Sequence, residues 1–125
     1  MKVLSVGARI LLGLIFLIFG LNIFFNFLNM GPLPTGLAGQ YVIALSQSHI
    51  FQAAAALQVI GGALLLINRY VALALVLLGP VVVNVLLYHF LLDLTGVSVA
   101  IVVTVLWFIV FYFHRSSFAG IFAQR

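Results

Sequence analysis

The sequence predicts an all-α protein, specifically a four-helix bundle that is integral to a membrane. Of its 125 residues, 66% are hydrophobic and 5% are charged, and the mean hydropathy is +1.41. A soluble domain carries far more charge on its surface. Each membrane crossing needs about 20 mostly apolar residues, so the chain has room for four crossings with short connections. We therefore expect a single transmembrane domain over residues 1–125.

Four apolar runs supply the predicted membrane helices, at about residues 8–28, 49–67, 71–92 and 97–113. Ser48 is a plausible N-cap for the second helix, and Pro80 predicts a kink in the third. Between the first two runs, a Pro- and Gly-rich turn precedes residues 37–45, which are moderately apolar but too short to span. We expect a short interfacial helix there, or a segment that folds back.

The basic residues predict the orientation of the bundle. After four crossings, the N-terminus, the turn at residues 68–70 and the C-terminal tail share one side of the membrane. All five lysines and arginines lie on or near that side, and the loops at 29–48 and 93–96 contain none: Lys2, Arg9, Arg69, Arg115 and Arg125. Cytoplasmic segments are enriched in Lys and Arg, so we expect cytoplasmic termini in a multi-pass inner-membrane protein.

The net charge of +4 does not indicate a nucleic-acid partner, because the basic residues are scattered between apolar runs. Small residues instead predict close helix packing. Gly7, Gly13 and Gly20 recur near a seven-residue spacing, and Gln58 lies on one helix face with Ala54 and Gly62. These faces suit contact with a neighbouring helix, a membrane partner or a second copy of the chain.

Polar side chains gather in the outer half of the predicted bundle, and they are the candidate ligand-binding residues: Asn22, Gln58, Asn84, Tyr88 and His89. Buried polar groups in lipid are costly without partners, so each requires an explanation. One hypothesis is an outward-facing polar cavity that holds the headgroup of an amphipathic small molecule. The alternative is that the amides hydrogen-bond one another and join the helices.

His89 is the one candidate for proton transfer, since histidine titrates near neutral pH. Asp93, the only acidic residue, follows it by four positions and can share its helix face. A haem held by His49 and His89 is conceivable from their expected depth, but we predict no metal site. The chain has no cysteine, which excludes thiol redox relays and iron–sulfur ligation.

Several segments together resemble the DoxX family of small bacterial membrane proteins. They are residues 8–16 (ARILLGLIF), 19–22 (FGLN), 58–70 (QVIGGALLLINRY), 78–80 (LGP) continuing through Asn84 and His89, and 113–118 (FHRSSF). The resemblance implies a four-helix membrane fold and an association with quinone-linked redox complexes. Related members often carry glutamate where Gln58 stands, so a proton-carrying carboxylate is missing here.

We therefore expect an accessory membrane subunit that binds a quinone or lipid and has no intrinsic cofactor. One alternative is a subunit of a quinone-linked oxidoreductase, in which His89 exchanges protons. Another is a purely structural partner that uses the glycine faces. No serine–histidine–acid set or phosphate-binding loop is present in the sequence, so no self-contained catalytic site is predicted.

Overall fold

The computed structural model describes residues 2–25, 34–92, 94 and 96–122. All regular structure within these residues is helical, which confirms the predicted all-α class for this part of the chain. The elements are α1 (Lys2–Phe25), α2 (Gly36–Ser48), α3 (Ile50–Ile67), α4 (Val71–Leu91), α5 (Val97–Phe113) and a 3-10 helix, η1 (Arg115–Phe122).

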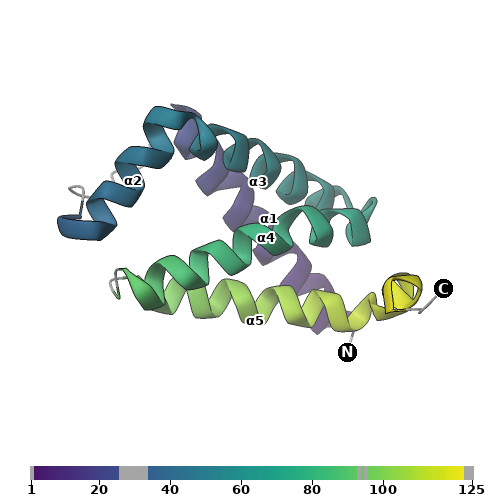
Figure 1. The fold of residues 1–125 in the computed structure, drawn as a ribbon. Helices are drawn as coiled ribbons and strands as arrows, with labels where there is room; N and C mark the ends of the chain where they lie inside the picture. The colour runs from purple at the N-terminus through teal and green to yellow at the C-terminus, as the bar shows by residue number, and fades with distance from the viewer. Residues whose placement is uncertain (1, 26–33, 93, 95, 123–125) are drawn as a thin grey trace.

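The four longer helices form a closed arrangement (Figure 1). Helix α1 packs against α3 and α5, while α4 packs against α3 and α5, so each of the four has two neighbours among the other three. The short helix α2 packs against α3 and leans out from the bundle at the end where α4 finishes. The start of α1 and the end of α5 lie together at the opposite end.

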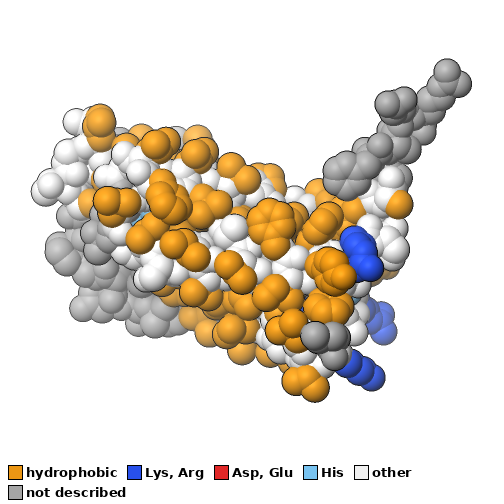
Figure 2. All heavy atoms as spheres, turned by 90° about the horizontal axis from the view of Figure 1, so that it is seen from below, with side chains coloured by type: hydrophobic (Ala, Val, Ile, Leu, Met, Phe, Trp, Pro, Cys, Tyr) orange, Lys and Arg blue, Asp and Glu red, His pale blue; other side chains and the backbone are white. Residues whose placement is uncertain are grey.

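Three helices, α1, α3 and α4, are long and apolar enough to cross a membrane. Helix α5 is equally apolar in character but has 17 residues. Large apolar side chains also cover much of the face shown in Figure 2. The exposed apolar residues include Ile60, Val83, Phe90 and Phe108. Such a surface suits contact with lipid, since water would penalise it.

Some helix boundaries differ from the prediction. Helix α1 begins at Lys2 rather than near Ala8, because residues 2–7 contain no proline and the single Gly7 does not end the helix, although they are less uniformly apolar. Its predicted continuation through residues 26–28 lies outside the described residues. Helix α4 ends at Leu91 rather than 92.

The expected N-cap of α3 is wrong. Ser48 is the last residue of α2, and His49 stands at the N-cap position with a left-handed backbone, φ 64°. The Ser48 hydroxyl oxygen still accepts a bond of 3.4 Å from the Ile50 N–H. The left-handed His49 thus turns the chain sharply from α2 into α3.

The contact between α1 and α3 depends on glycine. A Cβ atom on Gly62 would lie 2.7 Å from the backbone oxygen of Gly13 and from the backbone nitrogen of Leu17. Gly20 likewise lies against Ala55 and Gln58 of α3. The predicted packing role of Gly13 and Gly20 is therefore confirmed.

Arg9 joins the same two helices where α1 begins and α3 ends. Its guanidinium donates hydrogen bonds to the backbone oxygens of Leu65 and Leu66, in the last turn of α3. Carbonyls in that turn lack partners within the helix. A cation there also interacts favourably with the negative end of the helix dipole. Arg9 is therefore a structural cap as well as a basic residue at this end.

Candidate functional site

A polar and aromatic cluster connects α2 with α4. The Tyr41 hydroxyl, on α2, donates a hydrogen bond of 3.1 Å to Oδ1 of Asn84, on α4. The Tyr41 and Tyr88 rings lie 5.5 Å apart between centroids, at an interplanar angle of 30°. Asn84 is exposed, whereas both tyrosines are half-buried. The cluster is therefore partly open on its outer side.

His89 extends this cluster towards the start of α5. Its ring lies 5.1 Å from the Tyr88 ring in an edge-on arrangement, with an interplanar angle of 82°. A Cβ atom on Gly96 would approach His89 Cε1 to 3.2 Å, and Gly96 has φ 80°. Glycine thus allows the turn before α5 to lie against the imidazole. We call Tyr41, Asn84, Tyr88 and His89 the Tyr41–His89 cluster.

The two remaining predicted site residues, Asn22 and Gln58, are buried, with 7% and 9% of their surfaces exposed. The Gln58 Cβ lies 3.0 Å from the position of a Cβ on Gly20, which places Gln58 in the interface between α1 and α3. Asn22 follows Gly20 by two residues, about 200° further around α1. Asn22 therefore lies on a different side of α1 from the Gly20–Gln58 contact.

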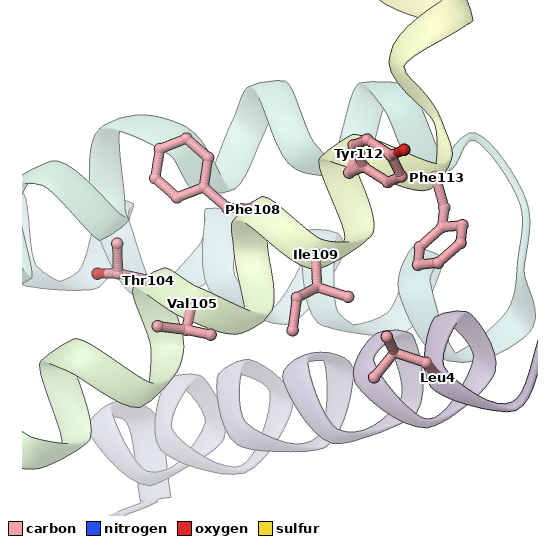
Figure 3. Close-up of a pocket in the computed structure, with 7 residues that line it drawn as sticks. All are labelled: Leu4, Thr104, Val105, Phe108, Ile109, Tyr112 and Phe113. Atoms are coloured by element: carbon pink, nitrogen blue, oxygen red, sulfur yellow. The ribbon is translucent and has the colours of Figure 1, made fainter. Parts of the chain in front are cut away.

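Two grooves lie on the part of the chain that the structure describes, and none of the five predicted residues lines either of them. The larger groove has a volume of about 510 Å³ and lies between α1 and α5 (Figure 3), lined by Leu4, Thr104, Val105, Phe108, Ile109, Tyr112 and Phe113. The smaller has about 300 Å³ and is lined by Ile15, Phe19, Ser98, Val99 and Val102. Both are predominantly apolar.

The other titratable residues are distributed as follows. His49 is exposed at the junction of α2 and α3, and Asp93, the expected neighbour of His89, lies outside the described residues. A His114 ring nitrogen lies 3.0 Å from the Val110 carbonyl oxygen. Within the described ranges, no three His, Asp or Glu side chains come together as metal ligands.

Tyr41 is the member of the cluster that sequence reasoning missed. The short segment that carries it was expected to be interfacial or to fold back, and it forms α2. A tyrosine in an interfacial helix is a useful signal, because its ring suits lipid while its hydroxyl needs a polar partner. The sequence separation of 43 between Tyr41 and Asn84 hides this pairing from any local pattern.

The described part of the chain thus belongs to the class of all-helical proteins, and three of its helices are long and apolar enough to cross a membrane. Its polar cluster lies between a short helix and a long one. Comparison of the chain with protein-family models, with curated proteins and with solved structures found no match. The resemblance to the DoxX family is accordingly a prediction from the residues quoted above.

Proposed function

We propose that the chain is a multi-pass protein of the bacterial inner membrane that crosses the bilayer four times, through α1, α3, α4 and α5. At about 1.5 Å per residue, α5 is about 25 Å long, and a crossing of that length requires modest thinning of the bilayer around it. Its apolar composition and its packing between α1 and α4 support the fourth crossing.

The distribution of cations supports cytoplasmic termini. Lys2 begins α1, Arg9 contacts the end of α3, Arg69 lies in the turn between α3 and α4, and Arg115 follows α5. Figure 2 shows the Lys and Arg side chains along one edge of the molecule, at one end of the bundle. By the positive-inside rule, that end faces the cytoplasm, and α2 with the Tyr41–His89 cluster lies towards the outer side.

In this orientation the protein is an accessory subunit of the DoxX type that binds a quinone or lipid at the Tyr41–His89 cluster. The observation that carries this proposal is the hydrogen bond from Tyr41 to Asn84 beside the paired tyrosine rings. Hydroxyl, amide and imidazole groups can bond to a quinone carbonyl or to a lipid ester. The aromatic rings offer apolar faces to the rest of the same molecule.

In this proposal the uncharged Gln58 packs helices together and does not bind the ligand. It lies in the glycine-rich interface between α1 and α3, where a carboxylate would have to be protonated or paired. An amide fits that interface without carrying a proton. The proton-coupled chemistry implied for relatives with glutamate is therefore not assigned to Gln58, and the protein acts here by binding rather than by catalysis.

The test is to measure the molecules that copurify with the protein in mild detergent, by mass spectrometry and absorbance. We expect a bound quinone or phospholipid in the unmodified protein. Tyr41→Phe removes one hydroxyl, and the loss of about 1 kcal/mol for a hydrogen bond corresponds to about a fivefold weaker affinity. Tyr70→Phe, at an exposed position in the turn between α3 and α4, is the matched control and leaves this affinity unchanged. A protein free of quinone and lipid would contradict the proposal.

A further inference from the structure

The groove between α1 and α5 is a second candidate binding surface, at the opposite end from the Tyr41–His89 cluster. Leu4 forms its α1 side, and residues of α5 form the remainder (Figure 3). Its only hydroxyl besides that of Tyr112 belongs to Thr104, which donates a bond of 2.7 Å to the Ala100 carbonyl oxygen. With that hydroxyl satisfied, the wall of the groove presents hydrocarbon.

The side chains along the groove remain accessible. Val105 is 51% exposed and Phe108 is 58% exposed, although both belong to a helix packed on two neighbours. In a membrane an open apolar groove of this kind is filled by hydrocarbon chains. An acyl chain lying along α5 fits this surface without displacing any side chain of the core.

One cation lies at an end of the groove. Arg115 is exposed and follows the lining residue Phe113 by two positions. Lys2 is also exposed, but it precedes Leu4 by two positions in α1, about 200° around the helix, so it does not share the Leu4 face. Arg115 is therefore the cation that the groove itself offers at the membrane interface.

Arg115 is held in place rather than free. Its Nη1 donates a bond of 2.6 Å to the Tyr112 carbonyl oxygen, and its guanidinium carbon lies 4.2 Å from the centroid of the Tyr112 ring. Tyr112 itself lines the groove. A guanidinium has five N–H donors, so those not used by the carbonyl can meet an anion at the mouth of the groove.

The geometry points to a binding site for an anionic phospholipid, with an acyl chain in the α1–α5 groove and the headgroup phosphate at Arg115. Basic pockets between membrane helices on the cytoplasmic side recognise anionic headgroups in this way. The inference rests on the proposed membrane crossing, but it does not depend on any ligand at the Tyr41–His89 cluster.

Native mass spectrometry of the detergent-purified full chain tests this inference. Phosphatidylglycerol and phosphatidylcholine with identical acyl chains are titrated separately, and the affinity of the first bound lipid is measured. Because each basic residue near the surface contributes about 1 kcal/mol, we expect phosphatidylglycerol to bind at least about fivefold more tightly. Equal affinities for the two lipids would overturn the inference.

Three variants separate the effect of the Arg115 charge from that of the groove. Arg115→Gln should remove about a fivefold preference for phosphatidylglycerol, whereas Arg69→Gln, a cation at the same end but in the turn between α3 and α4, should preserve it. An equal loss in both variants would indicate general attraction to a basic surface and would overturn the site.

Val105→Trp fills the groove and keeps every charge, so it should weaken the binding of both lipids. The position is exposed, and circular dichroism melting checks that the variant folds like the unmodified protein. If Val105→Trp instead converted a dimer to a monomer and left phosphatidylglycerol binding unchanged, a second copy of the chain would occupy the groove and the lipid site would be wrong. A loss of ligand at the Tyr41–His89 cluster alone would leave these results unaffected.

Discussion

The indole N–H of Trp107, on α5, donates a hydrogen bond of 3.1 Å to the backbone carbonyl oxygen of Leu75, on α4. This bond lies one turn before Pro80, which has no N–H to donate within α4. The Trp107 ring also lies 3.8 Å from the position of a Cβ on Gly79. A side chain of α5 thus supports α4 at the turn that proline weakens.

Trp107→Phe should therefore destabilise the protein. The variant keeps an aromatic ring but loses the bond to Leu75, and interhelical hydrogen bonds in membrane proteins contribute about 0.6 kcal/mol on average. The measurement is unfolding in detergent followed by circular dichroism. Ile101→Val, at an exposed position of the same helix, is the control. Equal stability of Trp107→Phe and the unmodified protein would show that the bond does not support α4.

Gly62→Ala should be more damaging, since the added methyl group would meet backbone atoms of Gly13 and Leu17 at 2.7 Å. Backbone atoms cannot move to another rotamer as a side chain can, so α1 and α3 must separate. Overpacking of this kind costs about 1–3 kcal/mol, measured as a lower free energy of unfolding in detergent.

Gly7→Ala is the matched control for that variant. Gly7 lies in the same helix as Gly13, but nothing lies within 4 Å of a Cβ placed there. Alanine favours helix by about 1 kcal/mol over glycine, so this variant should be at least as stable as the unmodified protein. Equal effects of the two substitutions would contradict the glycine-dependent packing of α1 on α3.

Arg9→Met should destabilise the bundle by removing the bonds to the carbonyl oxygens of Leu65 and Leu66. Methionine keeps an unbranched apolar stem, so most of the loss comes from the guanidinium. Hydrogen bonds to charged groups contribute about 1.5–3 kcal/mol, and unfolding in detergent measures the change. Arg69→Gln, at an exposed position, should have little effect. A similarly small effect for Arg9→Met would show that the bonds to Leu65 and Leu66 do not stabilise the bundle.

Periodic features of the chain were predictable because they depend on local sequence. Long apolar runs predict helices, and the spacing of Gly13 and Gly20 predicts a face for close packing, which α3 occupies. The same spacing wrongly predicts a packing contact at Gly7, because α3 ends at Ile67 and its last carbonyls lie level with Arg9. A repeat in one helix carries no information about where its partner stops.

The candidate site was less predictable, since it depends on contacts between distant residues. The sequence grouped Asn22, Gln58 and Asn84 by depth, but depth does not determine the face of the helix. In the structure Gln58 lies between α1 and α3, while Asn84 bonds to Tyr41 of α2. The left-handed backbone of His49, which directs α2, is likewise uncommon for a residue other than glycine.

The proposed orientation can be tested directly, because the chain contains no cysteine and single-cysteine variants therefore have no background. Gln47→Cys lies at the exposed end of α2, and Ser116→Cys lies at an exposed position after α5. A membrane-impermeant maleimide applied to intact spheroplasts should label Gln47→Cys. It should label Ser116→Cys only after the membrane is permeabilised. The reverse pattern would invert the bundle, and labelling of both variants in intact spheroplasts would mean that α5 does not complete a fourth crossing.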